Sequence, residues 1–250
     1  LDGITLSWAG EAVALVCLGY LYRYLPVRVG GFLVLLLALY RVFAIHLPEA
    51  RHSEPFTLVL NRPFLMLMCG PLAAAACAAA HFAWRRQARL ADTFLRRLLA
   101  IAAGLMLLAF AHIEAEQWLS FRATGEGVDA DYLKRCALTV LWALGACGFL
   151  AAGLPPRHVA FRLAGVMPLA MAVAFVVAQY LPRYAVAHPY ALAVNGRFAT
   201  ALLAVAVLFG FGLAAQDRRW RAAALVFASY ALLGLIHVEV REGMQLRLAG

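Results

Sequence analysis

Two short pairs of histidine and glutamate are the residues in this sequence best suited to acid–base chemistry. His112 and Glu114 lie at the end of one apolar stretch, and His237 and Glu239 lie at the end of another. Residues two apart on a helix are turned by about 200°, so the two members of a pair point to different faces. A proton-handling or metal site would require the pairs to converge from two helices. The plainer alternative is polar capping where each helix leaves an apolar environment.

Glu11 and Arg41 are a second candidate, because each is an ionisable residue inside an apolar stretch. Such a group costs about 3 kcal/mol or more at the centre of a membrane helix. If the two stretches form antiparallel helices, both residues lie a few positions from the same end. Their matched depth predicts an ion pair. It would be either a structural link between two helices or a site for a proton or a polar substrate.

Two asparagines, each followed closely by an arginine, precede further apolar stretches. Asn61 and Arg62 precede one stretch, and Asn195 and Arg197 precede another. We interpret both asparagines as helix N-caps, whose side-chain oxygens accept a free backbone N–H. Pro63 supports this interpretation, since proline favours the first turn of a helix. The arginines could bind an anion at the helix start, or serve as anchors to lipid headgroups.

Long apolar helices must position all of these residues. The chain is 65% hydrophobic and only 14% charged, with a mean hydropathy of +0.81, whereas soluble domains are about half apolar and a quarter charged. About 20 apolar residues in a helix cross the hydrocarbon core of a bilayer. The sequence therefore predicts an all-α, polytopic transmembrane helix bundle of about eight spans. The expected spans are 4–22, 29–47, 64–84, 95–118, 136–154, 159–181, 198–215 and 222–238.

The basic residues predict the orientation of these spans. The net charge is +9, and arginines are concentrated in the first, third, fifth and seventh connections. Lysine and arginine mark the cytoplasmic side, so both termini are predicted on the outer side. The predicted partner is therefore the lipid bilayer. Nucleic acid is excluded as a partner, since no basic face with interleaved aromatic residues is present.

An internal repeat organises the whole sequence. Trp8 and Trp142 lie 134 residues apart (142 − 8), and the same offset relates many other identical residues. These pairs are Gly19 with Gly153, Arg23 with Arg157, Arg28 with Arg162, Gly31 with Gly165, Asn61 with Asn195, and Phe64 with Phe198. After a shorter third loop, His112 matches His237 and Glu114 matches Glu239, at an offset of 125 (237 − 112).

The repeat predicts two tandem four-helix units, 1–122 and 133–250, joined by an outer linker, 123–132. Because each unit has an even number of spans, the two units have the same orientation in the membrane. At the offset of 134, Glu11 corresponds to Gly145 and Arg41 corresponds to Phe175. Both charges are absent together from the second unit, as expected for an ion pair.

Several short motifs resemble a known family. They are Trp8-Ala9-Gly10-Glu11, Leu141-Trp142-Ala143-Leu144, Phe161-Arg162-Leu163-Ala164-Gly165, Val194-Asn195-Gly196-Arg197-Phe198 and His237-Val238-Glu239-Val240-Arg241. In these the chain resembles a bacterial predicted-membrane-protein family, domain of unknown function 2339. The resemblance implies a location in the bacterial inner membrane and a longer parent chain. It implies no catalytic residue, because no activity is established for the family.

Three functions compete on this basis. The first is a transporter-like or lipid-binding or small-molecule-binding bundle, with a site between the repeats on the outer face. The second is a scaffold of an envelope complex, which would contact a membrane-protein partner through the alanine-rich face of 73–80. The third, ranked below both, is an enzyme acting on lipid-linked envelope glycans, with Glu114 and Glu239 as acid–base candidates. No cofactor and no metal site is predicted, because no zinc, phosphate-binding or dinucleotide motif is present.

Overall fold

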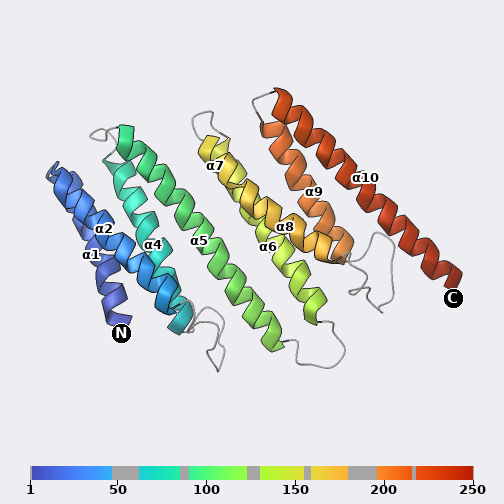
Figure 1. Ribbon diagram of the computed structural model, residues 1–250, viewed down its shortest axis with the longest axis horizontal. Coiled ribbons are helices and arrows are strands. Elements are labelled where there is room, and N and C mark those ends of the chain that lie inside the picture. The colour runs from blue at the N-terminus through green and yellow to red at the C-terminus, as the bar shows by residue number, and fades with distance from the viewer. Residues whose placement is uncertain are drawn as a thin grey trace. The chain divides into compact units, whose positions relative to one another are not determined.

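The computed structural model describes residues 2–46, 62–84, 90–122, 130–154, 159–179, 196–215 and 218–249. Within these ranges every element is helical (Figure 1). The elements are α1 (Asp2–Leu21), α2 (Leu25–Arg41), η1 (Val42–His46, a π-helix), α4 (Arg62–Ala83), α5 (Leu90–Arg122), α6 (Ala130–Gly153), α7 (Val159–Ala164), α8 (Val166–Gln179), α9 (Gly196–Ala214) and α10 (Arg218–Ala249).

Eight helical stretches among the described residues are long and apolar enough to cross a membrane. This confirms the prediction of an all-helical, multi-pass membrane protein. The predicted spans 95–118 and 222–238 lie within the apolar stretches Thr93–Ser120 and Arg221–Arg241. The helices themselves are longer, since α5 continues to Arg122 and α10 continues to Ala249, so both His–Glu pairs lie inside a helix. Polar capping by these pairs where the helices leave the apolar environment stays a prediction.

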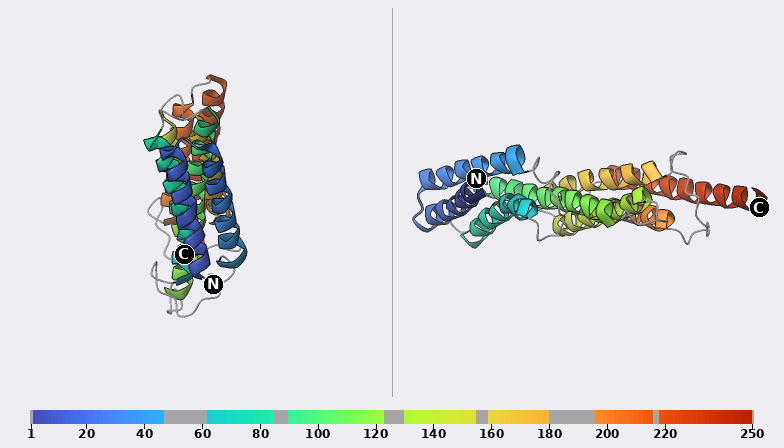
Figure 2. Two further views of the ribbon diagram at one scale, coloured as in Figure 1. Left: turned by 90° about the vertical axis from the view of Figure 1, so that its left-hand side faces the viewer. Right: turned by 90° about the horizontal axis from the view of Figure 1, so that it is seen from below.

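The chain divides into two compact units, Leu1–Phe121 and Arg122–Gly250. In the first unit, α1 and α2 run antiparallel and side by side (Figures 1 and 2). A tight turn joins them, in which Arg23 adopts a positive φ of 57°. The helices meet closely at Gly19. A Cβ atom at this position would lie only 2.7 Å from the backbone nitrogen of Arg28. Glycine is required there because the second helix occupies the space of a side chain.

Small residues form the core of the first unit. Ala9 and Ala12 of α1 pack against Ala73, Ala74 and Cys77 of α4, and all five are buried. Small side chains let membrane helices approach closely and gain dispersion contacts. Because these alanines of α4 are buried inside the unit, they do not form the lateral contact face that the scaffold hypothesis predicted.

The second unit has a similar local construction. α6 packs against α7, α8 and α9, and α10 packs against α9. α7 and α8 are separated by one turn residue, Gly165, which packs against Phe149 of α6 and Phe211 of α9. At Gly153, a Cβ atom would lie 2.8 Å from the backbone nitrogen of Arg162.

Candidate functional site

Seven polar residues from four helices gather at one end of the second unit. α6 begins and α8 ends at this end of the unit, where α9 also begins and α10 passes. We call these residues the polar cluster: Tyr132, Cys136 and Thr139 of α6, Gln179 of α8, Arg197 and Thr200 of α9, and Glu239 of α10. All except Tyr132 are buried. Polar residues buried within membrane spans are functional-site candidates, because their burial is costly.

Gln179 is the centre of the polar cluster. Its amide nitrogen donates a hydrogen bond of 2.9 Å to the Thr139 hydroxyl. Its amide oxygen accepts hydrogen bonds from Thr200, at 3.3 Å, and from the Cys136 thiol, at 3.8 Å. The side chain is only 2% exposed. One amide therefore links three helices in surroundings that exclude water.

The only two charged groups of the polar cluster neutralise each other. A guanidinium nitrogen of Arg197 lies 3.7 Å from a carboxylate oxygen of Glu239, and both side chains are less than a tenth exposed. The backbone N–H of Arg197 also donates to the Tyr132 hydroxyl at 2.8 Å. A buried pair of opposite charges stabilises each charge in a medium of low dielectric constant. The pair therefore leaves the polar cluster without net charge.

Helical periodicity explains how the residues come together. Tyr132, Cys136 and Thr139 are spaced four and three apart, so they share one face of α6. Arg197 and Thr200 are three apart and likewise share a face of α9. The Thr139 hydroxyl also donates to a backbone oxygen of the preceding turn, and the single proton of the Thr200 hydroxyl is shared between Gln179 and the backbone oxygen of Arg197. Such local bonds lower the cost of burying a hydroxyl in an apolar bundle.

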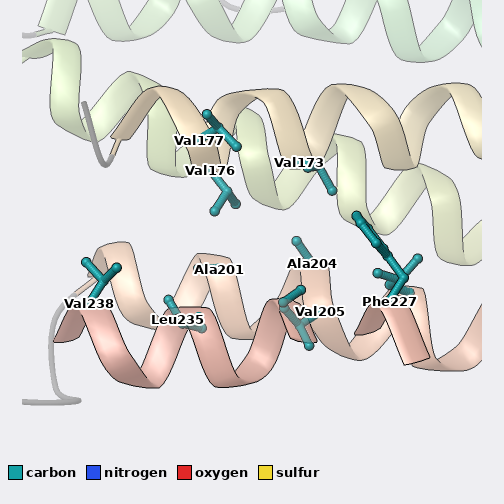
Figure 3. Close-up of a pocket in the computed structure, with 12 residues that line it drawn as sticks. Val173, Val176, Val177, Ala201, Ala204, Val205, Phe227, Leu235 and Val238 are labelled. Atoms are coloured by element: carbon teal, nitrogen blue, oxygen red, sulfur yellow. The ribbon is translucent and has the colours of Figure 1, made fainter. Parts of the chain in front are cut away.

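An apolar cavity of about 430 Å³ lies between α8, α9 and α10, and its lining includes Ala201 and Val238, the chain neighbours of Thr200 and Glu239. Figure 3 shows Val173 and Val176 of α8 projecting across the space toward α9 and α10. On α10 the lining extends from Phe227 to Val238, which at 1.5 Å per residue is roughly 16 Å. This is about half of the hydrocarbon thickness of ~30 Å. The cavity lies within the second unit, whereas sequence analysis placed the candidate site between the two repeats.

The structure brings together two of the residues predicted from sequence, Arg197 and Glu239. It does not place His237 beside them, because that side chain is exposed on α10 while Glu239 is buried. In the first unit, Glu114 is buried, and His112 lies 3.7 Å from Glu116 one turn away. Since Glu114 and Glu239 belong to different units, their convergence remains a prediction.

The other predicted residues are placed as follows. Glu11 is exposed on α1, while Arg41 donates to the Thr5 hydroxyl at 3.3 Å and lies over the Trp8 ring at 5.5 Å. The ion pair of Glu11 and Arg41 stays a prediction. The two asparagines, Asn61 and Asn195, and the side chain of Arg62 lie outside the described residues.

Sequence reasoning missed Gln179, Thr139 and Thr200, because it searched the spans for ionisable residues. Two signals were nevertheless available. Gln179 is the last polar residue of an otherwise apolar stretch, and Thr139 lies 134 residues after Thr5 (139 − 5). Thr5 and Thr139 are both fully buried. A search for neutral hydrogen-bonding residues within the spans would have found the centre of the polar cluster.

The first unit contains another buried polar contact, between α1 and α4. The Tyr20 hydroxyl is hydrogen-bonded to Nδ1 of His81, and both side chains are no more than 2% exposed. The Tyr20 ring is stacked on Trp84, and the Arg28 guanidinium lies 4.8 Å from the ring centre. The cavity described above is lined by α8, α9 and α10 and does not involve these residues. We therefore interpret them as a structural contact.

Comparisons with family models, with curated proteins and with solved structures find no match. Function must therefore be argued from the site itself. Among the described residues, no three of His, Cys, Asp or Glu gather closely enough to hold a metal ion.

Proposed function

We propose that the protein is a lipid-binding membrane protein whose second unit holds an amphiphile. Its acyl or isoprenoid chain lies in the apolar cavity, and its headgroup meets the polar cluster. The observation that carries this proposal is the position of the cavity, whose lining includes Ala201 and Val238, the chain neighbours of Thr200 and Glu239, and runs along α10 for about half the thickness of a bilayer. Its volume of about 430 Å³ lies within the range of small-molecule sites, roughly 300–1,000 Å³. A lipid of one leaflet has this length and this division into polar and apolar parts.

The proposal includes two tandem repeats in parallel orientation. Its support is the matched contact of Gly19 with Arg28 in the first unit and of Gly153 with Arg162 in the second. The hypothetical Cβ distances to the arginine nitrogens, 2.7 and 2.8 Å, are nearly the same. Glu114 and Glu239, matched at the offset of 125, are both buried. The same side of the membrane then holds both glutamates.

The bacterial inner membrane is the proposed location, with both termini outside, on the strength of the family resemblance and the arginine distribution. The polar cluster would then face the outer leaflet. The scaffold alternative has less support, since Ala73, Ala74, Ala78 and Ala80 of the alanine-rich face on α4 are buried. The enzyme alternative has less support too, because Glu239 is engaged by Arg197.

The test is to fill the cavity at Gly234. This residue lines the cavity, and a Cβ atom built there meets nothing within 4 Å. Gly234→Phe should therefore fold and block the chain of a bound lipid. Gly148→Phe is the matched control, because Gly148 has the same open surroundings but lies on α6, outside the cavity lining.

The measurement is photo-crosslinking of the purified protein with a diazirine-labelled fatty-acyl lipid, followed by peptide mapping. In the wild type and in Gly148→Phe, we expect label on α8, α9 and α10 near the cavity. In Gly234→Phe, this label should fall at least fivefold. Equal labelling of the three proteins would show that the lipid contacts only the outer surface, and the proposal would be rejected.

A further inference from the structure

We infer that side-chain size at three positions, Ala201, Ala231 and Leu235, makes the second unit a lipid site, while larger side chains fill the matched place in the first unit. The acyl chain of the lipid takes the space of side chains that the second unit lacks. This inference rests on the proposed function, because it uses both the lipid site and the proposed repeat. It predicts one bound lipid for each chain, although the chain has two similar units.

The cavity of the second unit is lined by one face of each of three helices. Ala231, Leu235 and Val238 are four and three residues apart on α10, so they share a face. Ala201 lines the cavity from α9. Figure 3 shows Val176 of α8 projecting into the space from the opposite side. Two of these five residues are alanines, whose side chains are too short to reach across the space.

The first unit has a packed apolar cluster of similar composition. Val42 of η1, Leu67 of α4 and Phe110 of α5 form one buried cluster, and each is at most 1% exposed. Met106 and Ile113 pack against it, and their spacing of four and three from Phe110 places them on the same face of α5. As in the second unit, three elements contribute, but here their side chains meet.

The offsets of the repeat match the members of this cluster to the lining of the cavity. One matched position has valine in both units, and at each of the others the larger side chain belongs to the first unit. The matches are Val42 with Val176 and Leu67 with Ala201 at the offset of 134, and Met106 with Ala231, Phe110 with Leu235 and Ile113 with Val238 at the offset of 125. The cavity therefore lies where the second unit has the smaller residues.

The size difference is confined to the half of the cavity near Ala201. At the other end the relation reverses, since Leu208 and Phe227 line the cavity and match Ala74 and Ala102 of the first unit. Large side chains are therefore present at that end of the second unit. The test consequently changes only the half in which the second unit has the smaller residues.

An apolar cavity of this kind favours an acyl chain over water. Every residue that lines it is apolar, and water needs polar partners to occupy a cavity. Unfilled space also forfeits the dispersion contacts of the side chains around it. In the first unit, Leu67, Met106 and Phe110 make these contacts with one another and with their neighbours. In the second unit, an acyl chain from the surrounding bilayer makes them.

The first experiment gives the second unit the side chains of the first. A variant with Ala201→Leu, Ala231→Met and Leu235→Phe should fold, because the added atoms occupy existing space. Its labelling on α8, α9 and α10 by the diazirine-labelled fatty-acyl lipid should fall at least fivefold from the wild-type level. Ala231→Met alone should lower the labelling at least twofold, and it serves if the triple variant does not fold.

The matched control makes the same three changes on the exposed surface of the same helices. It carries Ala206→Leu, Ala223→Met and Leu233→Phe, at exposed positions outside the lining of the cavity. Its labelling near the cavity should equal that of the wild type. An equal loss of label in the control would show that added bulk anywhere on α9 and α10 disturbs labelling, and the inference would be overturned.

The second experiment makes the reverse exchange. Leu67→Ala, Met106→Ala and Phe110→Leu together give the first unit the residues of the second. New label should then appear on α4 and α5, at least fivefold above the wild-type level. Because emptying a core destabilises a protein, Met106→Ala alone serves if the triple variant does not fold, and its label on α5 should rise at least twofold.

The outcomes separate the inference from the proposed function. If Gly234→Phe removes the label near the cavity but the exchange of side chains in the second unit does not, the inference is overturned and the lipid site stands. The same holds if the opened first unit gains no label. If neither Gly234→Phe nor the exchange changes the labelling, both the inference and the proposed function are overturned.

Discussion

At the scale of single residues, the closest helix contacts depend on two glycines. Gly19 and Gly153 each lie against the backbone of an arginine in the first turn of the following helix, Arg28 or Arg162. In the second unit this arginine also donates a 2.6 Å hydrogen bond to the backbone oxygen of Ala214, near the end of α9. The glycine thus allows the arginine to be placed where it satisfies a helix terminus.

The first prediction concerns these glycines. Gly19→Ala and Gly153→Ala should each destabilise the protein by about 1–3 kcal/mol, because the added methyl group has no space and the helices must separate. Gly10→Ala and Gly148→Ala should be neutral or stabilising by up to ~1 kcal/mol, since their surroundings are open and alanine favours the helix. Denaturant-dependent unfolding in mixed micelles measures all four. Equal effects at all four positions would contradict the assigned contacts.

Residue-level prediction of the site from sequence succeeded only in part. Arg197 was identified because it lies beside a predicted helix cap, and Glu239 because it belongs to a His–Glu pair at the end of an apolar stretch. Their partnership could not be predicted, since it depends on how α9 and α10 are rotated against each other. Gln179 was missed for the opposite reason, since a neutral amide near a span end does not interrupt the hydropathy pattern. Its importance comes from the threonines that two other helices bring to it.

At the scale of helices, contacts between polar aromatic residues fix the position of α1 against α4. Tyr20 contributes a hydroxyl to His81 and a ring face to Trp84, whose rings are stacked with centres 6.3 Å apart. Both kinds of interaction are buried. Their relative contributions can be separated by substitution.

The second prediction separates them. Tyr20→Phe should destabilise the protein by about 1 kcal/mol, because only one hydrogen bond is lost. Tyr20→Ala should cost about 3–5 kcal/mol, since the ring packing is lost as well. Tyr22→Phe is the control, because Tyr22 is exposed at 73%. Thermal unfolding in detergent, followed by circular dichroism, distinguishes the three variants. The assignment fails if Tyr20→Phe is as destabilising as Tyr20→Ala.

Hydropathy predicted the eight apolar spans, but not how far α5 and α10 continue beyond them. The apolar stretches must be helical in lipid, since every backbone polar group needs an internal partner. Past Val238, the sequence continues with Glu239, Arg241 and Glu242, which are good helix formers in water as well. Nothing in the hydropathy pattern ends α10 there, so the helix continues. α5 likewise continues as a helix past the end of its predicted span.

At the scale of the whole molecule, the arginine-rich connections predict which side of the membrane each end of the eight spans faces. With an even number of spans, both termini are expected on the same side. The charge rule predicts that this side is outside the cell, and the proposed lipid site would then open toward the outer leaflet.

The third prediction tests the orientation. A single cysteine introduced at Leu1 or at Gly250, in a variant whose five native cysteines are replaced by alanine or serine, should react with a membrane-impermeant maleimide in intact spheroplasts. A cysteine in place of Arg86, within the third connection, should react only after the membrane is permeabilised. Reaction of Arg86→Cys in intact spheroplasts would reverse the assigned orientation, and the cavity would then face the inner leaflet.

The length of α10 has a mechanical consequence. Its apolar span ends at Arg241, but the helix continues to Ala249, another eight residues or roughly 12 Å of rise. A continuous helix transmits rotation and tilt along its axis. A change in the packing of Phe227 or Leu235 around the cavity is therefore expected to shift the turns that follow Arg241. If the proposed lipid binds in the cavity, the direction of these last turns should depend on whether the cavity is occupied.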